Sequence, residues 1–388
     1  MTPDLRPCLL HIGQSKTGTT SIQSTLFWRL RDSRHQLITL DGFFGNQLLM
    51  SAFLEGEEVR ETVFLNMVPM GKLDALRNRS LEFLDRALSM ALARDAMPIL
   101  SAEAVWFYFS EEAMQQLRHF LEAKGFQPHV VGYLRAPWDW LESGFQQLAR
   151  VGETNLWEEL MNRVSGSQPR GCIDRFDRVF GREKVALHFF DPEKFPGGCV
   201  VRHFCELNGI SIPRGKVVRE NESLNLNALR FVHAYNRHIH GRGPASGRFL
   251  RRAFLIEALA GLPGPPVRLH QDVTAGFVDP FLEGKKWLEE RLGCEVSETL
   301  VSRRSGDVLR SREDLAQHGR EAVDWLGRQL GRAIAVNSNM AGNPEVAAGL
   351  ERLIWRSPGA MARVLWDKFH IRAERARRRR EVLNLAHG

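Results

Sequence analysis

The chain has 388 residues, of which 43% are hydrophobic and 26% are charged. This composition is typical of a globular protein with a sizeable buried core, and it excludes collagen-like, disordered and miniprotein classes. At roughly 150 residues per domain, the length fits two or three structural units. Lysine and arginine outnumber aspartate and glutamate by 53 to 46, a net charge of +7. This excess is compatible with an anionic small ligand, an acidic polymer or good solubility, and it does not require nucleic acid.

The five cysteines are scattered along the chain and none is spaced as CxxC. The sequence therefore predicts neither a zinc site nor a disulfide framework, and it favours a reducing compartment. The N-terminus lacks a basic start followed by a long apolar run, and no stretch approaches about 18 uninterrupted apolar residues. We expect a cytoplasmic protein without a membrane-spanning helix.

The first 200 residues alternate short β-rich apolar runs with longer amphipathic stretches. That alternation is the pattern of a parallel sheet covered by helices, so we predict an α/β fold with a P-loop-like parallel sheet of five strands. Leucines and aromatic residues recur at helical spacing over residues 73–88 and 138–148. The expected strands are residues 8–12, 36–40, 98–101, 129–134 and 185–189.

The second half of the chain differs from the first half in composition and in hydrophobic pattern. Segment 241–270 is rich in glycine, proline and arginine, and we expect an irregular surface insertion there. Beyond residue 277 the pattern is mostly helical. We therefore divide the chain into an α/β domain, residues 1–295, and a helical C-terminal extension, residues 296–388.

The extension ends in a basic tail, with six arginines and one glutamate in residues 372–380. Two interpretations stay open for it. It is a solvated helix end, or it is a polybasic patch that attracts an anionic membrane, such as the inner membrane face, or an acidic polysaccharide.

The first motif lies in the run PCLLHIGQSKTGTTSIQSTLFWRL, residues 7–30. An apolar strand leads into Gly13, then into a polar loop with Lys16 and Gly18, and then into an amphipathic helix. Glycines let the backbone turn several N–H groups inward, and the helix N-terminus adds partial positive charge, so the segment predicts a phosphate-binding loop. A strand–loop–helix connection that happens to contain glycine and threonine is the alternative.

The loop differs from the Walker A pattern GxxxxGK[ST]. Gly13 and Gly18 keep its spacing, but Thr19 stands where the lysine belongs, and Lys16 lies two residues before Gly18. No apolar strand ends in a convincing metal-holding aspartate. An ATP-dependent phosphoryl-transfer enzyme is therefore the less favoured alternative, and a catalytically silent nucleotide-binding module is another.

The second motif is HVVGYLRAPWDWLESGFQQ, residues 129–147. A buried strand ends at Arg135, Pro137 suits a first helical turn, and Ser143 follows the arginine by eight residues. The arginine fork can bind a phosphate through two hydrogen bonds, and the serine can donate to the same group. Alternatively, Arg135 is a structural ion-pair or helix-capping residue.

Together the two motifs resemble those of sulfotransferases that use 3′-phosphoadenosine 5′-phosphosulfate (PAPS), particularly bacterial carbohydrate sulfotransferases. HIGQSKTGTTSIQ resembles their 5′-phosphosulfate loop, and YLRAPWDWLESGF resembles their 3′-phosphate motif. Three further stretches are similar: ILSAE, VFGREKVALHFFD and NESLN, at residues 99–103, 179–191 and 221–225. The resemblance spans residues 9–229 and implies transfer of a sulfuryl group from PAPS, without a metal, to a carbohydrate or glycolipid acceptor.

The resemblance also implies roles for individual residues. Lys16 would contact the sulfate and its bridging oxygen, and Arg135 with Ser143 would hold the 3′-phosphate. The 5′-phosphate side would be held by Gln14, Ser15, Thr17, Gly18, Thr19 and Thr20.

An acceptor hydroxyl needs a general base, and two carboxylates are candidates. Glu103 closes the third expected strand, at the carboxyl edge of the sheet. Asp41 follows the second, at a position that resembles that of a catalytic carboxylate in branches of the family, although those carry glutamate there. Each carboxylate could instead cap a neighbouring helix.

Overall fold

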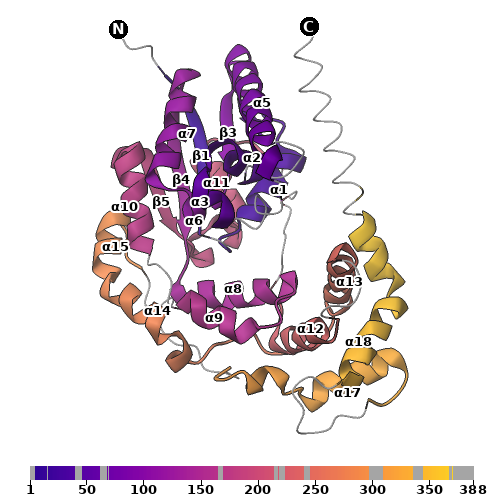
Figure 1. Cartoon of the computed structure of the whole chain (residues 1–388). Helices are drawn as coiled ribbons and strands as arrows, with labels where there is room; N and C mark the ends of the chain where they lie inside the picture. The colour runs from indigo at the N-terminus through magenta and orange to yellow at the C-terminus, as the bar shows by residue number, and fades with distance from the viewer. Residues whose placement is uncertain are drawn as a thin grey trace.

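The computed structural model describes residues 5–14, 16–39, 46–61, 68, 70–164, 169–213, 217, 223–239, 245–296, 309–334, 344–366 and 369. At its centre lies a five-stranded sheet in the order β2-β3-β1-β4-β5, with every neighbouring pair parallel (Figure 1). The predicted α/β class with a parallel sheet is confirmed, and each strand overlaps an expected apolar run. The strands are β1 (Arg6–Gly13), β2 (His35–Leu37), β3 (Met97–Ser101), β4 (Phe126–Leu134) and β5 (Val185–Phe189).

The register of the strands brings their carboxyl ends to one edge of the sheet. Gly13 at the end of β1 is paired with Tyr133 of β4, and Leu134 is paired with Phe189 at the end of β5. Ser101 at the end of β3 pairs with His11 of β1. The loops that follow these four strands therefore meet at this edge, where ligands bind in open parallel sheets.

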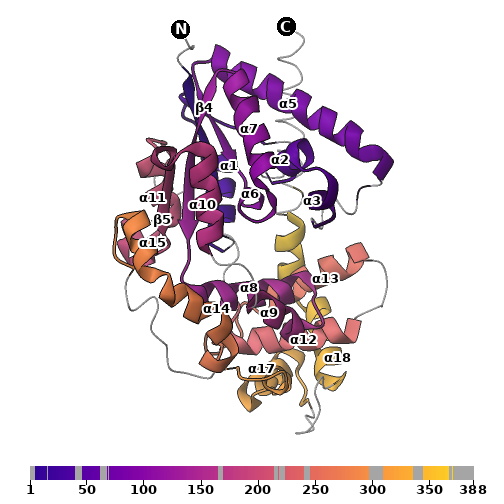
Figure 2. The same cartoon turned by 60° about the vertical axis from the view of Figure 1, so that its left-hand side comes forward.

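Helices cover both faces of the sheet (Figure 2). Successive side chains of a strand point to opposite faces. Leu10 and Ile12 accordingly belong to the hydrophobic core on one face, and Leu9 to the core on the other. The first core includes residues of α2 (Asn46–Phe53), α3 (Gly56–Glu61), α5 (Leu73–Ala93), α6 (Ala104–Tyr108), α7 (Glu111–Ala123), α10 (Pro169–Phe180) and α15 (Lys285–Leu292). The second includes residues of α1 (Thr19–Arg29) and α11 (Val200–Leu207).

A third hydrophobic core belongs to a group of helices on the side of the sheet's carboxyl edge (Figure 1). Helix α8 follows β4 directly and contributes Leu141 and Phe145 to this core, so it joins the helical group to the sheet. The C-terminal helices pack into the same core, and the expected boundary at residue 295 does not separate two packing units. The group comprises α8 (Pro137–Val151), α9 (Leu156–Val164), α12 (Leu226–Ile239), α13 (Ala245–Ala258), α14 (Gln271–Glu283), α17 (Arg320–Leu330) and α18 (Pro344–Arg356).

The expectation of irregular structure over segment 241–270 is wrong for α13. Glycine and proline lie toward the two ends of the segment, and between them Leu250, Phe254 and Leu255 recur at helical spacing. Phe254 and Leu255 are buried in the third core, which stabilises the helix through packing. Residues 241–244 lie outside the described part of the chain.

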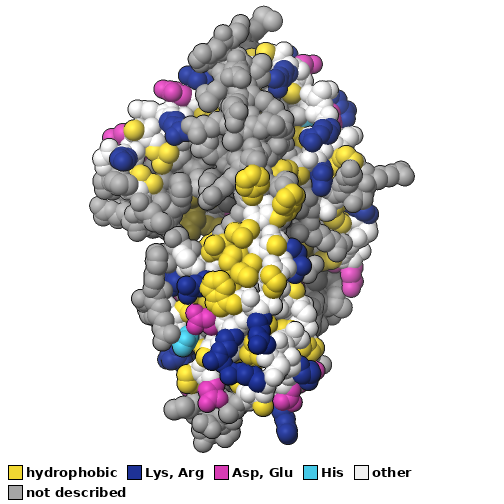
Figure 3. Space-filling model, turned by 90° about the vertical axis from the view of Figure 1, so that its right-hand side faces the viewer, with side chains coloured by type: hydrophobic (Ala, Val, Ile, Leu, Met, Phe, Trp, Pro, Cys, Tyr) yellow, Lys and Arg dark blue, Asp and Glu magenta, His cyan; other side chains and the backbone are white. Residues whose placement is uncertain are grey.

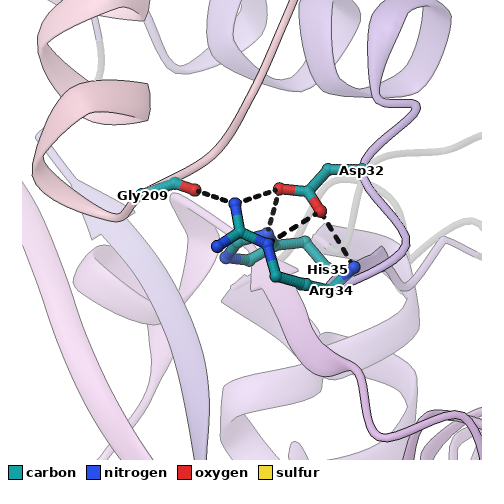
Figure 4. A network of polar contacts seen from close by, with 4 residues as sticks. All are labelled: Asp32, Arg34, His35 and Gly209. Carbon is teal, nitrogen blue, oxygen red and sulfur yellow. Dashed lines mark hydrogen bonds and ion pairs between the residues drawn. The ribbon is translucent and has the colours of Figure 1, made fainter.

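Edge strand β2 is anchored by a polar network around Asp32 (Figure 4). The buried Asp32 carboxylate accepts hydrogen bonds from the Arg34 guanidinium and from His35 Nδ1, at 3.1 and 3.0 Å. Arg34 also donates to the carbonyl oxygen of Gly209, beyond the end of α11, at 3.3 Å. Hydrogen bonding to Arg34 holds the pKa of Asp32 well below its usual range. The network ties the start of the edge strand to the helix layer beside it.

Two expectations concern membranes. Among the residues described, no helix is both long enough and apolar enough to cross a bilayer. The arginine-rich run 372–380 lies outside the described residues.

Candidate active site

Two residues of the loop after β1 have a backbone in the left-handed region. Gly18 precedes α1 as its N-cap residue with φ of 83°, and Lys16 also has a positive φ, 69°. A positive φ is costly for a non-glycine residue, by about 1–3 kcal/mol, and such residues concentrate at functional sites. A Cβ on Gly18 would lie 2.5 Å from Cγ1 of Val200 at the start of α11, so only glycine fits at this position.

Gln14 connects this loop to the loop after β4. Its backbone N–H donates to the carbonyl oxygen of Tyr133 at 3.0 Å, and its Oε1 accepts from the backbone N–H of Arg135 at 2.9 Å. Its carbonyl oxygen accepts from the Thr17 hydroxyl at 2.7 Å. The side chains of Gln14 and Thr17 are buried in these contacts. They fix the shape of the loop, and neither residue lines the cavity described below.

Arg135 lies at the end of β4 and faces Ser143 on α8. Its Nη1 lies 3.4 Å from the Ser143 hydroxyl and also donates to the carbonyl oxygen of Lys16. The guanidinium carbon lies 5.3 Å from the ring centre of Phe190, which follows β5. Pro137 occupies the first turn of α8, as expected, and sets the helix at the end of the strand. Arg135 is thus held by residues of the loops after β1 and β5 and of helix α8.

These loops enclose an open cavity of about 770 Å³, within the size range of small-molecule sites. It brings together residues that the sequence separates by more than 100 positions, including both cationic groups of the two motifs. Its lining includes Lys16, Gly18, Thr19, Thr20, Glu103, Phe107, Tyr108, Arg135, Ser143, Gln147 and Phe190. The hydroxyl oxygen of Thr19 is buried here without a hydrogen-bond partner among the described residues.

The charges in the cavity are mostly positive. Burial lowers the pKa of Lys16, the nearby Arg150 and Arg135 lower it further, and Glu103 opposes them. Burial raises the pKa of Glu103, and the Lys16 ammonium counteracts this. An anion bound between Lys16 and Arg135 would offset the repulsion among the cations.

Glu103 is the N-cap residue of α6, and it lines the cavity together with Lys16. Its side chain makes no capping hydrogen bond to that helix. The other candidate base, Asp41, lies outside the described residues, as does Ser15 of the loop. Thr19, Thr20, Arg135 and Ser143 line the cavity.

Three site residues were not identified from the sequence. Gln147 accepts a hydrogen bond from Lys16 Nζ at 3.4 Å, and Phe190 packs against Arg135. Arg150 acts on Lys16 through charge. Gln147 lies one helical turn after Ser143, and Phe190 directly follows a predicted strand. Helical spacing from Ser143 and the position of strand ends are therefore signals that could have found two of them.

A second cavity of about 530 Å³ adjoins the first and shares Arg135, Ser143 and Phe190 with it. Its wall contains a buried ion pair between Glu142 of α8 and Arg268, with 2.6 Å between Oε2 and Nη1. The other carboxylate oxygen accepts from the backbone N–H of Leu269 at 3.1 Å. This pair joins α8 to the segment that precedes α14.

Among the described residues, no group of three or more histidine, cysteine, aspartate or glutamate side chains is arranged to hold a metal ion. No protein-family model matches the chain, and no curated protein or solved structure matches it significantly. The two motifs and the cavity that their residues share are therefore the features of the chain that point to a function.

Proposed function

We propose that the protein is a sulfotransferase that moves a sulfuryl group from PAPS to a hydroxyl of a carbohydrate or glycolipid. The observation that carries the proposal is that Lys16 and Arg135, from the two motifs that resemble the PAPS-binding motifs, line one cavity. PAPS carries anionic groups on both sides of its ribose, at the 5′ and 3′ positions. A cavity with a cation from each motif is suited to such a ligand.

The loop side of the cavity suits the 5′-phosphosulfate. Gly18, Thr19 and Thr20 line the cavity at the N-terminus of α1, where the helix carries partial positive charge. The Arg135 guanidinium and the Ser143 hydroxyl, 3.4 Å apart, suit the 3′-phosphate. Gln14 connects the two halves, because its carbonyl and its side chain bond to one loop each.

The proposed reaction is an in-line displacement at sulfur. The acceptor oxygen forms a bond to sulfur while the bond from sulfur to the bridging phosphate oxygen breaks, and the departing phosphate gains negative charge. The Lys16 ammonium, held near this position, stabilises that charge. Glu103 accepts the proton of the acceptor hydroxyl, since it lines the same cavity and burial raises its pKa.

The acceptor class is proposed on the resemblance alone, and a cytoplasmic location on the scattered cysteines without paired spacing. The acceptor would lie beside Phe107 and Tyr108, which follow Glu103 on α6 and line the cavity. Aromatic side chains at this position are suited to stacking against sugar rings.

Binding of adenosine 3′,5′-bisphosphate tests the nucleotide site without knowledge of the acceptor. Isothermal titration calorimetry in EDTA should show binding by the wild-type chain, and Lys16→Ala should weaken it at least tenfold. Arg328→Ala, which removes an exposed arginine of α17, is the control and should leave the affinity unchanged. Binding of ATP that requires Mg²⁺, with no binding of the bisphosphate, would instead support a phosphoryl-transfer enzyme.

Transfer is then tested with ³⁵S-labelled PAPS and polysaccharide or glycolipid extracts, again in EDTA. The wild-type chain should label an acceptor, and Lys16→Ala should not. A chain that binds the bisphosphate but labels no acceptor in any extract would be a nucleotide-binding module, and the proposed activity would be wrong.

A further inference from the structure

Exposed aromatic side chains gather on the face formed by α13 and the C-terminal residues 344–369. Phe249 of α13 is 51% exposed, and Trp355, Trp366 and Phe369 are 63%, 62% and 68% exposed. Leu365 beside them is also exposed. Figure 3 shows hydrophobic side chains gathered in the middle of this side of the molecule, with lysine and arginine side chains below them. A cluster of this kind is unusual on a protein surface that faces only water.

The fold holds these side chains outward. Helix α18 buries Leu353 and Ile354 in the third core, and Trp355 follows on the opposite side. Residues 358–366 form a further helical segment, in which Met361 and Val364 pack against the same core and Trp366 points away from it. The aromatic residues are therefore presented by helices whose other side is packed.

Two ion pairs join α13 to this C-terminal segment. Arg251 lies 3.5 Å from Glu351 of α18, and Arg363 pairs with Glu257 near the end of α13. These two pairs hold α13 beside the C-terminal segment. We call the exposed large hydrophobic side chains of these two segments together the aromatic face; it consists of Phe249, Trp355, Leu365, Trp366 and Phe369.

The sequence around the aromatic face carries nearly all of the excess positive charge of the protein. Residues 344–380 contain ten lysines and arginines against four aspartates and glutamates, a net of +6 out of +7 for the whole chain. Six of these arginines follow Phe369 directly in sequence, in the run 372–380. Apolar and cationic character thus coincide in one part of the chain.

This combination indicates which partner the aromatic face fits. Because the basic run begins three residues after Phe369, a symmetric pair of two copies joined through the aromatic face would bring the two runs near each other, and like charges in contact are unfavourable. An anionic lipid surface offers an apolar layer for the aromatic side chains and negative charge for the lysines and arginines. Tryptophan and phenylalanine are stabilised at the boundary between headgroups and acyl chains, and each lysine or arginine near the surface adds roughly 1 kcal/mol of attraction.

We propose that the aromatic face docks on the surface of an anionic phospholipid bilayer, with the basic run 372–380 adding electrostatic attraction. The proposal concerns where the protein resides, and it holds whichever reaction the cavity catalyses. Aromatic insertion and basic attraction are two separate contributions, which together are what stable peripheral binding requires.

Vesicle flotation with the full chain tests the proposal. The anionic vesicles contain phosphatidylcholine with roughly 30% phosphatidylglycerol, and the neutral vesicles contain phosphatidylcholine alone. The protein should bind the anionic vesicles on the order of a hundredfold more tightly than the neutral ones. The double variant W355S/W366S should weaken binding roughly tenfold or more. Replacing the four arginines 377–380 by glutamine should weaken it on the order of a hundredfold.

A matched control is the double variant L207S/L282S, which removes two exposed hydrophobic side chains of α11 and α14 outside the aromatic face. It should bind vesicles like the wild type, and circular dichroism should show all variants folded. Equal binding by W355S/W366S and the wild type would overturn the proposal, as would failure of the wild type to bind anionic vesicles. A dimer in analytical ultracentrifugation that W355S/W366S abolishes, without vesicle binding, would assign the face to a second copy.

Discussion

The buried pair of Glu142 and Arg268 makes the stability of the protein depend on pH in a direction that can be measured. Burial raises the pKa of Glu142 to about 7, and Asp139 adds to this, while Arg268 and the backbone N–H of Leu269 act against it. In the unfolded chain a glutamate titrates near 4.3. The folded protein therefore keeps the Glu142 proton to a higher pH than the unfolded chain does.

The sign and the size of the effect follow from this difference. Between about pH 4.5 and 7 the folded state binds more protons than the unfolded state, so the contribution of Glu142 to the free energy of unfolding falls as pH rises. At 1.36 kcal/mol per pH unit, the loss across this window is up to about 3 kcal/mol. Glu142→Gln removes the titrating group and should remove this contribution to the slope.

The assay is urea unfolding of the wild type and of Glu142→Gln at intervals from pH 5 to pH 8. The free energy of unfolding of the variant should rise relative to that of the wild type by up to about 3 kcal/mol across this range. Glu158→Gln, which breaks an exposed ion pair with Arg312, is the control and should shift the difference by less than about 1 kcal/mol. A difference between wild type and Glu142→Gln that stays constant with pH would refute the reasoning.

Three further predictions concern other parts of the fold. Gly18→Ala should destabilise the protein by about 1–3 kcal/mol and weaken binding of adenosine 3′,5′-bisphosphate, because φ is positive and the new Cβ meets Val200. Thermal unfolding measures the stability and calorimetry measures the binding. An unchanged melting temperature would contradict the described conformation of Gly18. Glu103→Gln should lower kcat of the proposed sulfuryl transfer by about 10²–10⁴-fold and remove the rise of its rate with pH on the acidic side. A wild-type pH profile in the variant would exclude Glu103 as the base. Asp32→Ala should cost about 1 kcal/mol at pH 7 through lost hydrogen bonds. Because the folded pKa of Asp32 is depressed, wild-type stability from this group is lost as pH falls, and the difference in urea unfolding between the two should shrink in acid; a difference that grows instead would contradict it.

The sheet and the two motifs could be predicted from the sequence because their signals are local. Each strand is a short apolar run, and Gly13, Gly18 and Pro137 mark the turns that follow β1 and β4. Parallel pairing then places the ends of these strands at one edge, so the meeting of Lys16 with Arg135 follows from the topology.

Other features depend on contacts between distant residues and could not be predicted in this way. Helix α13 was not predicted, because the glycines and prolines that flank it dominate the composition of the segment. The helix is stabilised by packing against α18, a contact that the local sequence does not indicate. The burial of Gln14 between two loops, and its hydrogen bond to the Arg135 N–H across 121 positions, have no local signature. The resemblance implied that Gln14 holds the 5′-phosphate side of the nucleotide, and in the fold its side chain is buried in contacts between the two loops.

The most direct test of the account is whether Lys16 and Arg135 hold the two phosphates of one nucleotide. The ³¹P NMR spectrum of adenosine 3′,5′-bisphosphate has one resonance for each phosphate, and at saturating protein both should shift with the wild-type chain. Arg135→Ala should return the 3′ resonance toward its free position and leave the 5′ resonance shifted, and Lys16→Ala should do the reverse. A 3′ resonance that does not shift with the wild type, or that is unaffected by Arg135→Ala while the 5′ resonance changes, would contradict the proposed nucleotide site.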